Sequence, residues 1–256
     1  MTIKIYPSSF AEPAGATTKS EYNSGCPVYE VFKRELPNRK EIDPIYSAIG
    51  ALGEEYHIAR LGTVKEREIP IKYQLTDNIQ ISGRYDGICD EFVYEFKTTI
   101  SRTLYSSIIN KGIYKMSYLG QLVTYMCLLK RSKGKLCVAY AHFDKDITSL
   151  KFEPRDFIIE IRNDHIYVDD EPTKHTASGL MKFYSIIADA HLKKTFPPAT
   201  INDKACFRCP LQDLCAFGTK DKSEFSKQIK EIEFVEVESG SPKIQIHNTR
   251  KKSSKV

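Results

Sequence analysis

The stretch ISGRYDGICDEFVYEFKTT, residues 81–99, decides how this chain folds. Two runs of strand-forming residues flank an Asp-Glu pair at its middle, and this pattern predicts an antiparallel hairpin. With the turn centred on that pair, Asp86 lies directly opposite Glu95, and both side chains leave the same face of the sheet. Lys97, two residues beyond Glu95, returns to that face. The hairpin is therefore expected to gather two carboxylates and one ammonium group.

These three charged groups create a chemical expectation. Two carboxylates whose Cβ atoms lie about 4.5 to 5.5 Å apart repel each other unless a cation neutralises them. A hard divalent cation with oxygen ligands is the usual solution, and it leaves the lysine to face an anion or a nucleophilic water. The pattern indicates a hydrolytic metal site. The alternative is a solvated hairpin face with an ordinary Asp, Glu and Lys, and a three-residue loop would shift the register and remove the pairing.

A second polar pair interrupts an otherwise apolar segment. Gln121 and Tyr125 are four residues apart in SYLGQLVTYMCLLK, residues 117–130, which reads as a buried helix. Residues four apart share one helix face, so both polar side chains point to one place where core residues are expected. The alternative is a tyrosine with its hydroxyl at the surface beside a glutamine at the helix edge.

The remaining segments predict an α/β protein. Asp43 and Pro44 are typical of the cap and first residue of a helix. Apolar residues recur there at helical spacing until Gly62, namely Ile45, Ile49, Leu52 and Tyr56. We expect further strands at residues 68–73, 135–143, 157–161 and 165–168, and a further helix at 178–194. This order predicts a mixed central sheet flanked by helices rather than a bundle or a sandwich.

The chain reads as one domain with an extension. No internal repeat or low-complexity run interrupts its main part, so we expect a single domain over residues 1–218. Residues 219–256 are rich in Lys, Glu and Ser, and their structure is uncertain. Within them EIEFVEVESGSPKIQIH, residues 231–247, is compatible with a hairpin, and a docking strand, an added sheet edge and a partly disordered tail remain open.

Composition narrows the class of protein. With 41% hydrophobic and 28% charged residues among 256, the chain is neither disordered nor fibrous. Its longest nearly apolar stretch, residues 119–129, is far shorter than the roughly 20 residues that cross a bilayer, and the N-terminus lacks a signal-peptide core. We therefore expect a cytoplasmic protein. The formal net charge of +5 suits a polyanionic partner.

Taken together, these motifs resemble a known family. Gly53 to His57, Asp86, the run Glu95-Phe96-Lys97 and the segment from Gln121 to Tyr125 occur in the order and spacing of the RecB-type branch of the PD-(D/E)XK nucleases. The resemblance implies a restriction-endonuclease-like core. The chain departs from the family pattern at Tyr85, which stands where the family name has proline.

The resemblance also implies roles for individual residues. It implies that Mg²⁺ or Mn²⁺ is bound by the side chains of His57, Asp86 and Glu95 and by the main-chain carbonyl of Phe96. It implies that Lys97 orients the attacking water, and that Gln121 and Tyr125 help to hold DNA and the site. A lone histidine on a helix is more often structural, so His57 as a ligand depends on the other motifs.

The seven cysteines fall into two groups. Cys206, Cys209 and Cys215 cluster in ACFRCPLQDLC, and a tight thiolate cluster needs a fourth ligand, for which Cys26 is the best candidate. The residues alone leave zinc and a [4Fe–4S] cluster open. The other three fall in helix or strand patterns and are expected in the core, namely Cys89, Cys127 and Cys137. One N-terminal and three C-terminal cysteines resemble the iron–sulfur RecB-type nucleases, including the CRISPR-associated four-cysteine exonucleases, and this implies a [4Fe–4S] cluster that joins the two ends of the domain.

Basic residues gather in one segment before the first helix, and basic residues interleave with tyrosines in a second segment over residues 102–118. They read either as a channel for single-stranded DNA or as a solvated face. These residues are Lys33, Arg34, Arg39, Lys40, Arg102, Tyr105, Lys111, Tyr114, Lys115 and Tyr118.

The sequence thus predicts a Mg²⁺- or Mn²⁺-dependent DNA exonuclease that hydrolyses phosphodiester bonds, with single-stranded DNA as the expected substrate. The resemblance implies processing of spacer precursors in CRISPR adaptation, beside an integrase complex. The alternatives are a free-standing viral or DNA-repair nuclease, a non-hydrolytic DNA-binding or scaffold subunit, and a zinc-ribbon binding protein.

Overall fold

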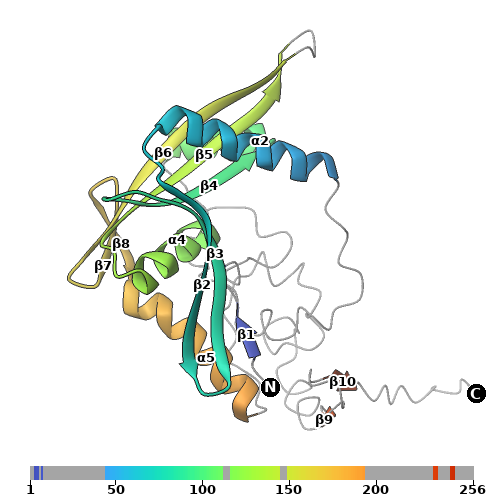
Figure 1. Ribbon diagram of the computed structural model, residues 1–256, viewed down its shortest axis with the longest axis vertical. Coiled ribbons are helices and arrows are strands. Elements are labelled where there is room, and N and C mark those ends of the chain that lie inside the picture. The colour runs from blue at the N-terminus through green and yellow to red at the C-terminus, as the bar shows by residue number, and fades with distance from the viewer. Residues whose placement is uncertain are drawn as a thin grey trace, which may run out of the picture.

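The computed structural model describes residues 3–5, 7, 44–111, 116–144, 149–193, 233–235 and 243–245. These residues form four helices, one large sheet and a separate two-stranded ribbon (Figure 1). The helices are α2 (Pro44–Leu61), α3 (Arg102–Lys111), α4 (Met116–Leu128) and α5 (Ala177–Lys193). The strands of the large sheet are β1 (Ile3–Ile5), β2 (Glu66–Thr76), β3 (Ile79–Ile88), β4 (Val93–Thr99), β5 (Lys133–Phe143), β6 (Leu150–Arg162), β7 (His165–Val168) and β8 (Glu171–Thr176). The ribbon pairs β9 (Glu233–Val235) with β10 (Lys243–Gln245) antiparallel, inside the segment compatible with a hairpin.

The large sheet is mixed. Its strands lie in the order β1, β3, β4, β5, β6, β7 and β8, with β2 added on β3. β1 pairs parallel with β3, and β4 pairs parallel with β5, whereas the other neighbours run antiparallel. The expected mixed sheet flanked by helices is therefore confirmed.

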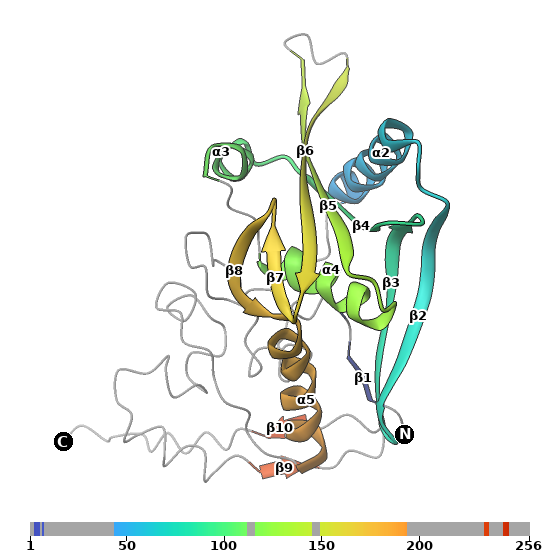
Figure 2. The same ribbon diagram turned by 90° about the vertical axis from the view of Figure 1, so that its left-hand side faces the viewer.

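The hairpin of β3 and β4 has the register that its turn predicts. Gly87 lies opposite Tyr94, and Ile88 lies opposite Val93. This register sets Asp86 level with Glu95. The ladder between the two strands ends at Gly87, and from there the strands separate (Figure 2).

Helices α2 and α4 cover opposite faces of β4 and β5 (Figure 2). Side chains alternate along a strand, so Leu136 packs into the core that α4 covers. Its neighbour Cys137 packs with Phe96 on the other face, where Ile58 and Leu61 of α2 cover them. The two faces of β4 thus have separate environments.

Some of the fold differs from the sequence-based expectation. β1, α3 and β8 have no counterpart among the expected elements. Helix α2 occupies the expected residues, yet Ile45 and Leu52 are 53% and 54% exposed, whereas Ile49, Gly53 and His57 are buried. The boundary expected near residue 218 lies outside the described residues. Among the described helices, none is long and apolar enough to span a membrane.

Gly53 sets the distance between α2 and β4. A Cβ atom there would lie 1.9 Å from Thr98 Oγ1 and 3.0 Å from Thr98 Cβ, so alanine does not fit at this spacing. Gly50, one turn earlier on the same helix, has no atom within 4 Å of a Cβ. The close approach of α2 to the sheet therefore requires glycine at position 53, whereas position 50 has room for a side chain.

We predict that Gly53→Ala lowers the free energy of unfolding by about 1 to 3 kcal/mol, because the added methyl overpacks the contact with β4. Gly50→Ala is the matched control and should raise the free energy of unfolding by up to about 1 kcal/mol, because alanine is the better helix former. Urea denaturation measures both. Shifts of the same sign in the two variants would contradict this role of Gly53.

Candidate active site

The candidate site lies where β3 leaves β4. One edge of β3 pairs with β2 over most of its length. The other edge pairs with β1 at residues 79–81 and with β4 at residues 87 and 88, which leaves a gap between these two contacts. Backbone groups in such a gap need other partners, because an unpaired buried N–H or C=O costs free energy.

Two side chains take over the missing ladder bonds. The hydroxyl of Tyr125, on α4, accepts a hydrogen bond from the Arg84 N–H at 3.2 Å and donates one to the Arg84 carbonyl at 2.8 Å. Two residues further along β3, Asp86 Oδ2 accepts a hydrogen bond from the Phe96 N–H at 2.7 Å. The carboxylate of Asp86 therefore bridges β3 to β4 at the point where the strands part.

Glu95 and Lys97 complete the predicted cluster. Glu95 is fully buried, and Lys97 forms an ion pair with it. The ammonium group of Lys97 also lies 5.5 Å from the centre of the Tyr118 ring on α4. The structure thus brings Asp86, Glu95 and Lys97 together, as the hairpin register predicts.

The cluster behaves electrostatically as one unit. Burial raises the pKa of Glu95 to about 8, with Lys97 opposing the rise and Asp86 adding to it. Burial also raises the pKa of Asp86, against the influence of Lys97. Burial disfavours the charge of Lys97, but the two carboxylates outweigh burial and raise its pKa. A further positive charge at this place would favour the ionised form of both carboxyl groups.

Glu54 of α2 belongs to this site, and the sequence analysis missed it. Burial and the nearby Asp86 raise the pKa of Glu54, and Glu54 in turn contributes to the raised pKa of Glu95. The available signal was its position in GEEYH, one helical turn before His57. With Glu54 the site holds an excess of carboxylate over ammonium.

Gln121 and Tyr125 meet as the helical spacing predicts. Gln121 is half-buried, and its side chain hydrogen bonds to the Tyr125 hydroxyl. Burial raises the pKa of Tyr125 to about 12, and Glu95 is the next contributor to this rise. Tyr125 is therefore a neutral donor and acceptor beside the carboxylates. The alternative of a surface hydroxyl does not hold, since Tyr125 is 2% exposed.

His57 lies in a different environment from Asp86 and Glu95. It is fully buried on the other face of β4, where its ring stacks on the Phe96 ring with centroids 5.4 Å apart and planes 7° apart. Nδ1 lies 3.2 Å from Arg60 Nη2, and Arg60 also holds Asp156 through both guanidinium nitrogens. Burial, then Arg60, lowers the pKa of His57 to about 4, so the ring is neutral.

The tautomer of His57 follows from this contact. A guanidinium group donates and never accepts, so Nδ1 is the acceptor and the proton of the neutral ring is on Nε2. Nε2 forms no well-aligned hydrogen bond in the part of the chain that the structure describes, although the main chain of Lys97 lies near the ring and opposes the fall in its pKa. The ligand atoms of His57, Cys137 and Asp156 lie within 4.8 Å of one another, which is close enough to hold one metal ion. Among the described residues, the ligand atoms of His57, Asp86 and Glu95 do not form such a group.

The donors around Asp86 fit a hard divalent cation. Glu95 Oε2 is buried and accepts no hydrogen bond from the described residues. A buried acceptor in that state costs about 1 to 3 kcal/mol, and a bound cation supplies the missing partner. Carboxylate oxygens are the ligands that Mg²⁺, Ca²⁺ and Mn²⁺ prefer.

The remaining predicted residues fall into three groups. The cysteines expected in the core pack there, with Cys137 buried and Cys89 and Cys127 half-buried. Arg102 and Tyr105 lie on α3, the former exposed and the latter buried. The others lie outside the described residues, or have side chains outside them, namely Cys26, Lys33, Arg34, Arg39, Lys40, Lys111, Tyr114, Lys115, Cys206, Cys209 and Cys215.

Comparisons with known proteins assign no family. No family model and no curated protein matches the chain. Among solved structures, the chain is similar to SSO0001, at 16% identity and a TM-score of 0.43 over 85% of this chain and 88% of that one. It is also similar to the alkaline exonuclease LHK-Exo from Laribacter hongkongensis, at 15% identity and a TM-score of 0.44 over 75% and 88%. A phage-related exonuclease from Haemophilus somnus 129PT matches at 15% identity and a TM-score of 0.42 over 74% and 97%.

We predict that Mn²⁺ raises the Tm of the wild-type protein, because an ion that binds only the folded state stabilises it by about 2.7 kcal/mol at 100 times its Kd. Asp86→Asn and Glu95→Gln should each remove most of this rise. Asp90→Asn is the matched control, since Asp90 is an exposed carboxylate in the adjoining turn that pairs with Lys65. A wild-type response to Mn²⁺ in Asp86→Asn would show that the ion binds elsewhere.

Proposed function

We propose that this protein is a Mg²⁺- or Mn²⁺-dependent DNA exonuclease that hydrolyses phosphodiester bonds at the ends of single-stranded DNA. The convergence of Asp86, Glu95 and Lys97 at the gap between β3 and β4 carries this proposal. Two carboxylates and a protonated lysine at an open strand edge are the groups that metal-assisted hydrolysis of a phosphodiester requires. The formal net charge of +5 suits a polyanionic substrate.

Asp86 and Glu95, with the Phe96 carbonyl, are proposed to hold the metal ion. When bound, the ion polarises the phosphate and lowers the pKa of the attacking water. Asp86 is fixed for this task by the Phe96 N–H, so its second oxygen remains available. Glu95 is fixed by burial in the core beside α4.

Lys97 is proposed to orient the water and to stabilise the charge that develops on the phosphate. Its pKa is raised by its carboxylate neighbours despite burial, so it donates hydrogen bonds and does not act as a general base. Gln121 and Tyr125 are proposed to support the site and to contact DNA. The paired bonds from Tyr125 to Arg84 support the first of these roles, because they hold β3 next to Asp86.

His57 is proposed as a further metal ligand through Nε2. Its fully buried Nε2 atom supports this role, because it forms no well-aligned hydrogen bond with the described residues. Ligation by Nε2 requires the ring proton on Nδ1, and this in turn requires Arg60 to leave Nδ1. The metal-bound state of His57 therefore needs a shift of the Arg60 side chain and a movement of His57 toward Asp86 and Glu95, because its ring lies on the other face of β4.

We further propose a structural [4Fe–4S] cluster on Cys26, Cys206, Cys209 and Cys215. Four thiolates are the donor set that such a cluster takes. The packing of the other three cysteines in the core supports this assignment, because it leaves those four for a shared site. Processing of spacer precursors beside a CRISPR integrase, in the cytoplasm, is the biological setting that the cysteine arrangement favours.

We predict that Asp86→Ala, Glu95→Ala and Lys97→Ala each abolish Mn²⁺-dependent cleavage of end-labelled single-stranded DNA. Binding of the same DNA in chelator should remain, because it depends on the basic surface and not on the metal. Asp90→Ala is the control and should cleave at the wild-type rate. Wild-type cleavage by either carboxylate variant would remove the proposed site. If the wild-type protein binds DNA but does not cleave it, the result would instead favour a non-hydrolytic DNA-binding subunit.

We predict that protein purified without oxygen is brown, with iron and sulfide in a cluster held by four thiolates. Changing Cys26, Cys206, Cys209 or Cys215 to serine should bleach the colour and lower the Tm. Cys89→Ser should keep the colour, because that thiol packs against Tyr94 in the hairpin. Metal analysis and absorbance spectra measure this. A colourless wild-type protein with stoichiometric zinc would overturn the iron–sulfur assignment and leave the nuclease proposal standing.

A further inference from the structure

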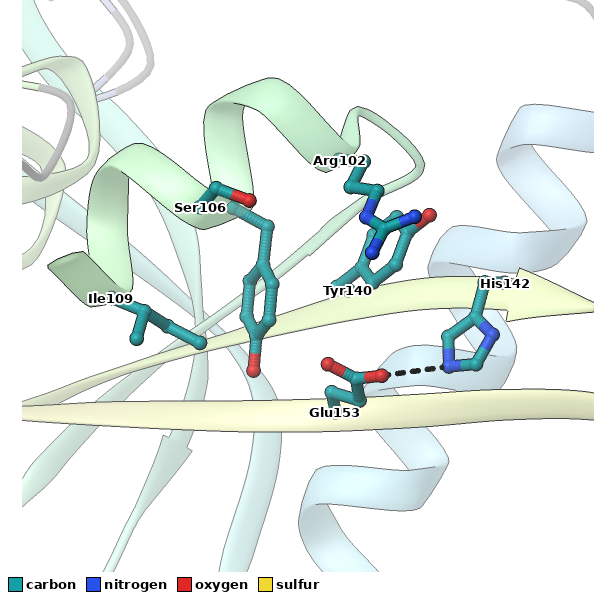
Figure 3. Close-up of a pocket in the computed structure, with 7 residues that line it drawn as sticks. Arg102, Ser106, Ile109, Tyr140, His142 and Glu153 are labelled. Carbon is teal, nitrogen blue, oxygen red and sulfur yellow. Dashed lines mark ion pairs between the residues drawn. The ribbon is translucent and has the colours of Figure 1, made fainter.

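A cavity of about 310 Å³ lies between α3 and the strands β5 and β6 (Figure 3). Helix α3 begins at a cap, because the Ser101 hydroxyl accepts a hydrogen bond from the Leu104 N–H at 3.2 Å. The helix then turns one face to the cavity at positions spaced by three and four residues. The residues of this face are Arg102, Tyr105, Ser106 and Ile109.

The strands supply the opposite wall. Tyr140 and His142 alternate on β5, and Glu153 lies opposite Tyr140 on β6. The ring of Tyr140 stacks on Tyr105 with centroids 5.3 Å apart and on His142 with centroids 5.1 Å apart. An ion pair of 3.0 Å between His142 Nε2 and Glu153 Oε1 fixes the far side of the cavity (Figure 3). The wall is thus a continuous aromatic surface with polar groups along it.

The cavity adjoins the candidate active site on the same face of the sheet. Tyr140 is the register partner of Thr99, which lies two residues beyond Lys97 on β4. Residues two apart on a strand share a face and lie about 6.6 Å apart. A chain of nucleotides whose phosphate reaches Lys97 therefore has its neighbouring base within reach of Tyr140.

The chemistry of the cavity favours a base over a phosphate. One carboxylate oxygen of Glu153 is held by His142, and the other can accept a hydrogen bond from an exocyclic amino group of a base. The aromatic wall offers a stacking surface, and stacking of this kind is tolerant of sequence. Its volume is at the lower end of the range of about 300 to 1,000 Å³ for small-ligand pockets, which suits one planar base. Arg102 is exposed and is free to meet the phosphate beside that base.

We propose that this cavity binds one nucleobase of single-stranded DNA next to the phosphate that is cleaved. The inference rests on the proposed nuclease function and adds to it a site whose strand wall, formed by Tyr140, His142 and Glu153, has no counterpart in the sequence-based expectations. The inner face of α3 contributes Arg102 and Tyr105, two of the residues expected to line a channel for single-stranded DNA. The cavity would then be a positioning site, because a base held there fixes the DNA strand relative to Asp86 and Glu95.

The test uses the full-length protein and a set of single-stranded oligodeoxynucleotides, each with one abasic residue at a different position. Affinities are measured in chelator by fluorescence anisotropy. In the wild type, one abasic position should weaken binding about 5- to 150-fold, the effect of one lost base stack. Tyr140→Leu should weaken binding of the intact strand by a similar factor and lose the response to that abasic position.

A second variant tests the cavity from the opposite wall. Ser106→Phe fills it from α3 without a change in β5, and it should also lose the response to that abasic position. The matched controls are Thr103→Phe, an exposed position of α3 outside the cavity, and Tyr73→Leu, an exposed tyrosine on β2. Both should keep the wild-type response.

Cleavage of the same strands with Mn²⁺ separates the two proposals. If the wild type cleaves but both cavity variants keep the wild-type response to every abasic position, the base site is wrong and the nuclease proposal stands. If the wild type does not cleave, the nuclease proposal fails, and the abasic series still decides whether the cavity holds a base. An equal effect of every abasic position in the wild type would also overturn the base site.

Discussion

The separation of β3 from β4 is the constraint on which the site depends. A regular ladder that continued past Gly87 would place Asp86 opposite Glu95 without backbone bonds between them, and it would bond the Phe96 N–H to the main chain of Tyr85. Instead, the carboxylate of Asp86 takes the Phe96 N–H, and the Tyr125 hydroxyl takes both backbone groups of Arg84. The free energy that the open edge would otherwise cost, about 1 to 3 kcal/mol for each orphaned group, is thereby avoided. The side chains that carry chemistry are the same ones that make the gap stable.

Successive side chains of β4 point to opposite faces of the sheet, so the residues next to the site lie in two different environments. Glu95 and Lys97 face α4, whereas Phe96 faces α2 together with His57. Helix α2 comes close enough to influence both sides because Gly53 has no side chain to hold it away from Thr98. Glu54 of that helix affects the carboxylates electrostatically, while His57 packs against Arg60. One helix therefore joins two environments that the strand itself keeps apart.

The predictable parts of the site are those that local rules decide. The turn between β3 and β4 and the two-residue period of a strand were enough to place Asp86, Glu95 and Lys97 together. Helical spacing likewise joined Gln121 to Tyr125. The buried face of α2 was not predictable from apolar spacing, because its contacts with the sheet are made by a glycine and a histidine. Glu54 has one local signal, its position one helical turn before His57, whereas the cavity wall of Tyr140 and Glu153 depends on how distant segments pack, and no local pattern marks it.

The ion pair between Lys97 and Glu95 links the parts of the proposed mechanism. Within the described residues, Lys97 is the main cation that acts on these carboxylates, with a smaller contribution from Arg84 to Asp86, and its own charge is maintained by them. On the proposed function, Glu95 and Asp86 would hold a divalent cation, which would supply positive charge at the oxygens that Lys97 now contacts. Lys97, which shares a strand face with Glu95 two positions away, would then be the group placed to turn its donors to the phosphate and the water.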